Sequence, residues 1–156
     1  MSLAVAALAV FFGPLVSRSI SKRQLGAHRL DMVAQARQQW IDTVRDATSE
    51  ILANIDILRE RNSESGWSQD EFHDHVANSK EFREILFLVN KVELLLNPAE
   101  SKPQTLLRDL KEARRFIWKE IGPDNEEDMM KLERSIISTT GSILKEEWER
   151  IKQLKT

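Results

Sequence analysis

The hydrophobic pattern begins with a compact apolar run and then takes on the spacing of helices. Residues 2–16 read SLAVAALAVFFGPLV, with no charged side chain. Such a run predicts a membrane-spanning helix, although it is shorter than the usual length of about 20 residues. A signal peptide carries positive charge ahead of its apolar stretch, an interfacial helix carries a basic face within it, and this run has neither. We therefore predict a transmembrane segment over residues 1–20, with a buried core helix as the alternative.

The charges beside this run predict its orientation. The flanking basic residues Arg18, Lys22, Arg23 and Arg29 all follow the run, and no acid lies among them. Segments rich in Lys and Arg stay in the cytoplasm. We therefore expect a single-pass protein with its N-terminus outside the cell membrane and residues 21–156 in the cytoplasm.

Beyond the run, apolar side chains recur at every third or fourth position, as on one face of a helix. The first such seam continues to residues 62–67 without a clear stop, and Gly26 is its weakest point. Ser68 and Glu71 form a capping-box signature that opens a second helix, in which the polar pair at 78–79 marks a break or kink.

Two further helices follow. Pro98 is expected at the first position of a third helix, which ends at Gly122 and Pro123. Acids at 126–128 favour the start of a fourth helix through the helix dipole. Long helices with short links predict an all-α protein, in which residues 21–156 form an antiparallel bundle of about four helices.

The predicted core follows these helical faces. On the first helix the seam comprises Ala27, Leu30, Ala34, Arg37, Ile41, Val44, Thr48, Ile51, Ile55 and Leu58. The second and third helices are expected to contribute Phe72, Val76, Phe82, Ile85, Leu86, Val89, Val92, Leu96, Leu106, Leu110, Ala113, Ile117 and Ile121. The fourth is expected to bury Met130, Ile137, Leu144, Ile151 and Leu154.

Composition narrows the chemistry further. Cysteine is absent, which excludes disulfides, thiolate metal sites and Cys nucleophiles. The net charge of −2 combines a basic N-terminal segment with an acidic body, which is no general nucleic-acid footprint. His73 and His75 are two residues apart, whereas metal ligands on one helix face prefer a spacing of four. With no phosphate loop or nucleophile elbow in the sequence either, we expect no enzymatic activity, no cofactor and no metal.

Two clusters of charged and aromatic residues form the candidate site. One lies on the first helix and the other on the fourth, and these helices can be neighbours in an up-down bundle. Ion pairs between the clusters would be a structural salt bridge framed by two Trp rings or, alternatively, a polar gate or subunit contact. The predicted polar cluster comprises Arg37, Trp40, Arg45, Glu146, Glu147 and Trp148.

A short string offers a different function. Arg23 and His28 stand in an R-x4-H arrangement, which is similar to the active-site motif of HEPN ribonucleases, themselves helical bundles. That likeness would imply a membrane-tethered ribonuclease with Arg23 and His28 as its catalytic pair. The string lies beside the predicted span, outside the predicted bundle core.

Four longer strings carry a broader resemblance. They are Ile20-Ser21-Lys22-Arg23-Gln24, Arg37-x-x-Trp40-Ile41-x-x-x-Arg45-Asp46, Leu95-Leu96-Asn97-Pro98-x-Glu100 and Leu144-Lys145-x-Glu147-Trp148-Glu149-Arg150-x-Lys152. In this order they resemble a widespread group of small bacterial membrane-anchored helical proteins without assigned function. Where that group often has a His five residues after the proline, this sequence has Pro103, so no role of that His is carried over.

The expected architecture is also similar to that of the small pore-forming accessory membrane proteins of type VI-B CRISPR loci. This resemblance implies a homo-oligomer in the bacterial inner membrane, in contact with lipid, that forms a pore in antiphage defence. We expect a self-associating membrane effector of this kind. The alternative is a membrane-tethered scaffold that binds a cytosolic partner.

Overall fold

The computed structural model describes the backbone of residues 2–65, 68–119 and 126–154. It describes the side chains of residues 26, 28–61, 68, 70–117 and 126–154. The described residues form five helices and no strand, so the predicted all-α class is confirmed. The helices are α1 (Ser2–Ser65), α2 (Gln69–Asn78), α3 (Lys80–Leu95), α4 (Ser101–Lys119) and α5 (Glu126–Leu154).

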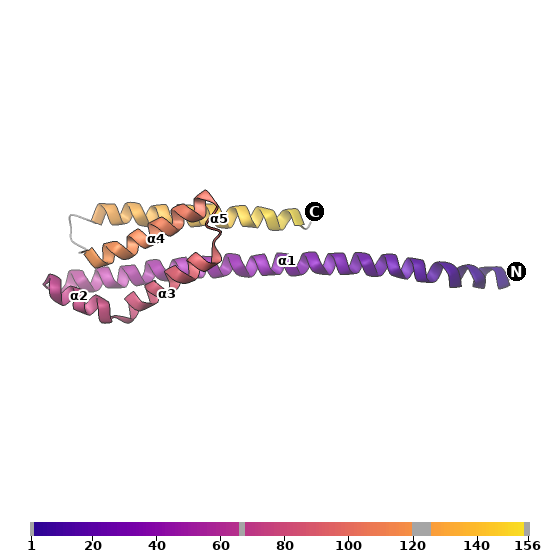
Figure 1. Cartoon of the computed structure of the whole chain (residues 1–156), viewed down its shortest axis with the longest axis horizontal. Helices are drawn as coiled ribbons and strands as arrows, with labels where there is room; N and C mark the ends of the chain where they lie inside the picture. The colour runs from indigo at the N-terminus through magenta and orange to yellow at the C-terminus, as the bar shows by residue number, and fades with distance from the viewer. Residues whose placement is uncertain (1, 66–67, 120–125, 155–156) are drawn as a thin grey trace.

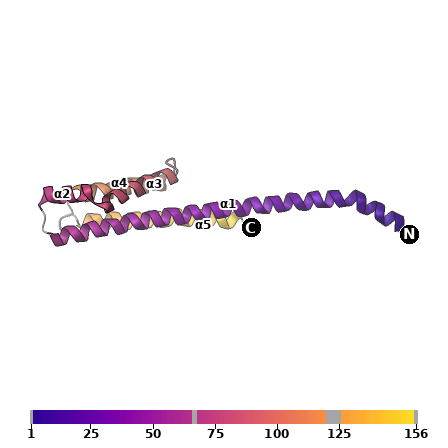
Figure 2. The ribbon, with the colours of Figure 1, turned by 90° about the horizontal axis from the view of Figure 1, so that it is seen from below.

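The helices form a bundle around one half of α1. Helix α1 packs against α3 and α5, and α4 packs against the same two helices from the other side. The N-terminal half of α1 extends beyond the bundle as a single rod, and α5 runs antiparallel to α1 and ends about halfway along it (Figure 1). Seen at right angles, α1 and α5 lie in one layer and α2, α3 and α4 in the other (Figure 2).

Helix α1 follows its predicted apolar seam only where other helices cover it. Between Ala34 and Leu58 the seam is buried, except for Arg37, which is partly exposed. Leu30, which was expected in the core, is 46% exposed, and Ala27 is outside the described side chains. The reason is the length of α5, since Ile151 near its C-terminal end packs against Ala34. The helix continues through Gly26 without a break.

Ser79 divides the predicted second helix into α2 and α3. Its backbone is extended, its N–H donates to the Val76 carbonyl, and its hydroxyl accepts a hydrogen bond from the Phe82 N–H at 3.1 Å. One residue therefore caps two helices, which favours a sharp break over a kink. The capping box at Ser68 and Glu71 is confirmed, and Ser68 lowers the pKa of the Glu71 carboxyl by donating hydrogen bonds to it.

Helix α4 begins three residues later than Pro98, which corrects the predicted start. Asn97 Oδ1 accepts a hydrogen bond from the Ala99 N–H at 3.1 Å, and such a side-chain turn competes with helix formation. The proline inside the helix is Pro103, in the first turn, where the missing N–H has no helical acceptor in any case.

From residue 129 to residue 143 the buried face of α5 differs by one residue from the predicted one, whereas Ile151 is buried as predicted. Met129, Ile136 and Ile143 are buried, whereas Met130 is 37% and Ile137 is 59% exposed. Each exposed residue directly follows a buried one, so both faces repeat every seven residues and periodicity alone cannot choose between them. Between its apolar positions the exposed face carries Arg134 and Gly141, neither of which can fill a core.

The predicted transmembrane segment, residues 1–20, is outside the described side chains. Within the described part of the chain, no helix combines the length and the apolar character needed to cross a membrane.

The corrected register of α5 predicts opposite outcomes for two neighbouring isoleucines. Ile136→Ala should lower the free energy of unfolding by about 2–5 kcal/mol, because it leaves a cavity in the core. Ile137→Ala, on the exposed side, should change it by less than about 0.5 kcal/mol. Chemical denaturation of both variants of the full chain measures the difference. A larger loss for Ile137→Ala would show that the predicted face, and not the observed one, is buried.

Candidate functional site

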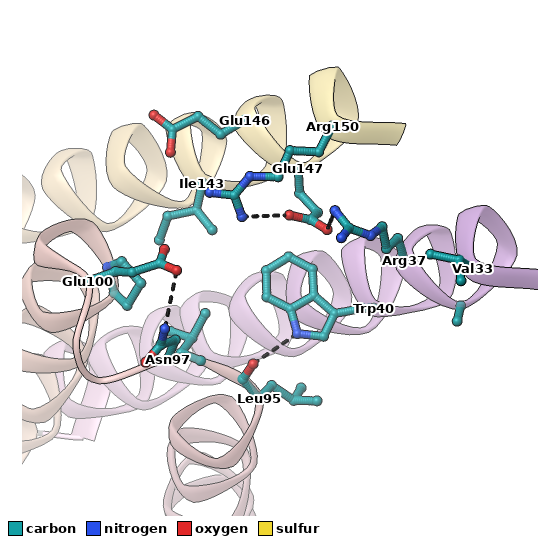
Figure 3. Close-up of a pocket in the computed structure, with 13 residues that line it drawn as sticks. Val33, Arg37, Trp40, Leu95, Asn97, Glu100, Ile143, Glu146, Glu147 and Arg150 are labelled. Atoms are coloured by element: carbon teal, nitrogen blue, oxygen red, sulfur yellow. Dashed lines mark hydrogen bonds and ion pairs between the residues drawn. The ribbon is translucent and has the colours of Figure 1, made fainter. Parts of the chain in front are cut away.

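A pocket of about 430 Å³ opens at the end of the bundle from which α1 extends. Three segments line it: residues 33–40 of α1, residues 95–103 at the junction of α3 and α4, and residues 143–150 of α5. Its volume lies within the range typical of ligand sites. Figure 3 shows the Trp40 ring in the middle, with the α5 side chains above it and the α3–α4 junction on the other side.

Trp40 joins α1 to the end of α3. Its indole Nε1–H donates a hydrogen bond of 2.9 Å to the Leu95 carbonyl. The last carbonyls of a helix have no partner within that helix, so the indole satisfies a group that α3 leaves open. The ring also packs against both clusters of buried side chains. Trp40 therefore fixes the position of the α3–α4 junction relative to α1.

Glu147 is shared by two arginines at the upper wall of the pocket. Its Oε1 accepts from Arg37 Nη1 at 2.8 Å, and its Oε2 accepts from Arg150 Nη1 at 3.0 Å. The Glu147 side chain is only 14% exposed. Because shielding from water strengthens such a charge-assisted contact, this triad is worth more than an ordinary surface pair.

A second charged group joins α4 to α5 beside the pocket. Lys102 Nζ contacts the Glu146 carboxylate and donates a hydrogen bond of 2.7 Å to Ser142 Oγ. The bond from Lys102 holds the pKa of Glu146 below its ordinary value of 4.5. A Ser–Lys pair can act as a nucleophile and base when the amine is neutral. Here Lys102 Nζ donates to the hydroxyl and to the carboxylate at once, which is the geometry of a structural contact between α4 and α5.

The structure therefore brings together part of the predicted cluster. Arg37, Trp40, Glu146 and Glu147 line one pocket, and one of the expected ion pairs, Arg37 with Glu147, is present. Glu146 pairs with α4 and not with α1.

Arg45 and Trp148 are not part of this arrangement. Arg45 Nη1 bonds Asp42 Oδ1 at 2.7 Å on the surface of α1. Eight residues correspond to about 2.2 helical turns, so Arg45 lies on a different side of α1 from Arg37. Trp148 is 45% exposed, with Lys152 Nζ 5.9 Å from its ring centroid. It directly follows Glu147, and adjacent residues of a helix point in different directions.

Of the two residues of the ribonuclease alternative, the structure describes the side chain of His28, which does not line the pocket. His28 is exposed on the part of α1 beyond the bundle, as is Arg29. Arg18, Lys22 and Arg23 are outside the described side chains. Among the residues that the structure describes, no group of three or more His, Cys, Asp or Glu is placed to hold a metal ion.

Several pocket residues, including Arg150, Asn97 and Glu100, were not predicted as site residues from the sequence. The resemblance contained a signal for them, because residues from three of its four sequence strings line this pocket.

No protein family, curated protein or solved structure matches the chain.

The hydrogen bond from Trp40 predicts a difference between two tryptophans. Trp40→Phe keeps most of the apolar contact but removes the donor to Leu95, and should lower the free energy of unfolding by about 1 kcal/mol. Trp148→Phe, on the surface, should stay within about 0.5 kcal/mol of the parent. Denaturation curves of the full chain measure both. Equal losses would mean that the bond to Leu95 contributes nothing specific.

Proposed function

We propose that this chain is a membrane-anchored binding module that holds a segment of a partner protein in the Trp40 pocket. The observation that carries the proposal is the site itself, a pocket built by three separate segments at the end of the bundle from which α1 extends. Apolar side chains with a few placed charged groups are typical of binding sites.

The pairing of charges in the pocket supports binding over catalysis. The Glu147 carboxylate is engaged by two arginines, and Glu146 is engaged by Lys102. A general base or nucleophile needs a free path to the substrate. These carboxylates are instead engaged in hydrogen bonds with cationic side chains, which suits recognition.

The continuity of α1 supports a tethering role. One helix joins the apolar N-terminal run to the bundle. Residues 21–33 lie between the predicted span and the first pocket residue, Val33. At 1.5 Å per residue these 13 positions hold the pocket about 20 Å from the end of the span. A rigid link of this length would present a bound partner at a fixed height above the membrane.

Site-specific photocrosslinking tests the proposal. A photoreactive residue at Ala36, which lines the pocket, should form adducts with a partner in cells that express the full chain. The same residue at Ser49, exposed on the bundle part of α1, is the matched control and should not. Arg150→Glu in the Ala36 variant should abolish the adduct while the protein stays in the membrane fraction. Adducts that are absent at Ala36, or identical at both positions, would contradict a binding role for the pocket.

A second candidate is the self-associating membrane effector, with the pore that the resemblance implies. The exposed apolar side chains Met130, Ile137 and Trp148 of α5 favour it, because they could pack against another copy. A ring of copies is necessary, since one span of an 18.0 kDa chain cannot enclose a channel. A two-fold contact through this face would bring Arg134 against its own counterpart, because copies anchored in the same membrane are parallel, and a ring would need a second, different face as the partner surface. That repulsion is why we place the binding module first.

Cysteine crosslinking tests the second candidate, since the natural chain has no cysteine of its own. If copies associate through α5, mild oxidation of Ile137→Cys in membranes should give a covalent dimer in high yield. Ser49→Cys, on another helix, should remain monomeric. Monomer from both variants would remove a symmetric contact through α5 between two copies.

A further inference from the structure

We propose that the Trp40 pocket accepts the free C-terminus of a partner polypeptide whose last side chain is apolar. The inference rests on the proposed binding function and names the ligand. Three properties of the pocket carry it: an excess of guanidinium donors, an adjoining apolar surface, and acceptor groups across the pocket.

The guanidinium donors exceed the acceptors that the described residues supply. Each arginine carries five N–H donors. Arg37 and Arg150 each give one hydrogen bond, from Nη1, and both bonds go to Glu147. Arg37 and Arg150 share the shielded Glu147 carboxylate, whereas Glu146, which also lines the pocket, contacts Lys102, and Arg150 is 53% exposed. A further carboxylate can bind these donors without displacing Glu147.

The adjoining surface favours a carboxylate that carries an apolar group. Trp40 lies three residues from Arg37 on the same helix, and residues at that spacing are neighbours about 5–6 Å apart. The indole N–H is already bonded to Leu95, so the ring offers mainly apolar contact. Ile143 and Pro103 extend the apolar lining. The last residue of a peptide carries both the terminal carboxylate and its side chain. Its carboxylate can therefore bind Arg37 while its side chain contacts the Trp40 ring.

The far side of the pocket favours a peptide over a phosphate or a simple fatty acid. In Figure 3, Glu100 and Asn97 lie on one side of the Trp40 ring and Arg37 on the other. Glu100 is exposed and accepts one hydrogen bond, from Asn97 Nδ2 at 3.3 Å. Its negative charge repels a phosphate dianion. It can accept the N–H groups of a peptide, which a fatty acid does not have.

The test uses the full chain in lipid nanodiscs and three probes. They are acetyl-Ala-Leu-Leu with a free carboxylate, the same peptide with a C-terminal amide, and 4-methylpentanoate. Binding is followed by the indole N–H signal of Trp40 in ¹H–¹⁵N spectra, assigned with Trp40→Phe. One charge-assisted hydrogen-bonded contact corresponds to about a tenfold change in affinity. The acid peptide should therefore bind about tenfold more tightly than the amide and than 4-methylpentanoate.

Two variants make the result specific. Arg150→Gln leaves Arg37 to hold Glu147, and should reduce the preference for the acid peptide to about twofold or less. Lys152→Gln removes a nearby cation that does not line the pocket, and should leave the preference unchanged. Thermal unfolding followed by circular dichroism checks that both variants fold.

Equal binding of acid and amide, or an unchanged preference in Arg150→Gln, would overturn the inference. Equal binding of 4-methylpentanoate would overturn it in favour of small carboxylates. These failures are distinguishable from failure of the proposed function, because photocrosslinking at Ala36 would still capture a partner that binds in another way.

Discussion

The antiparallel contact between α1 and α5 is the interaction on which the bundle and its pocket depend. Two sets of ion pairs fix the register of these long helices. At one end Glu147 lies between Arg37 and Arg150, and at the other Arg59 reaches Glu133 at 2.9 Å. Burial raises the pKa of Glu133, and the positive charge of Arg59 opposes this shift.

The pocket follows from this register. Sliding α5 by one turn would move Glu147 about 5.4 Å along α1 and away from Arg37. Trp40 then sets the remaining wall, because its bond to the Leu95 carbonyl holds the turn after α3. The site therefore combines one charged contact between long helices with one neutral contact to a helix end. The α1 residues that make these two contacts, Arg37 and Trp40, are three positions apart in the sequence.

The features that could be predicted from the sequence are those set by local chemistry. The continuous first helix, the Ser68 capping box and the break at residues 78–79 all depend on neighbours in the chain. The apolar pattern alone could not identify the buried face of α5, because apolar residues stand side by side at 129–130, 136–137 and 143–144, and the available signal was Arg134 and Gly141 on the exposed face. Which member of each pair is buried depends on the helices packed against it, and that is tertiary information.

The same distinction applies to the site. Arg37 and Glu147 were predictable as partners, because an arginine on an apolar seam needs an anion beside it. Arg45 was wrongly placed with them because eight residues overshoot two full turns. Arg150 and Asn97 were missed as pocket residues, since each is an ordinary surface type whose position depends on how α5 and the α3–α4 turn meet α1.

A double-mutant cycle between Arg37→Ala and Glu147→Ala tests the central contact most directly. The free energies of unfolding of the two single variants and the double variant give the coupling between the side chains. We predict a coupling of about 1 kcal/mol or more, as for residues in one ion-pair network, and none between Arg45→Ala and Glu147→Ala. Additive effects of Arg37→Ala and Glu147→Ala would contradict the register of α5 on α1 and, with it, the pocket.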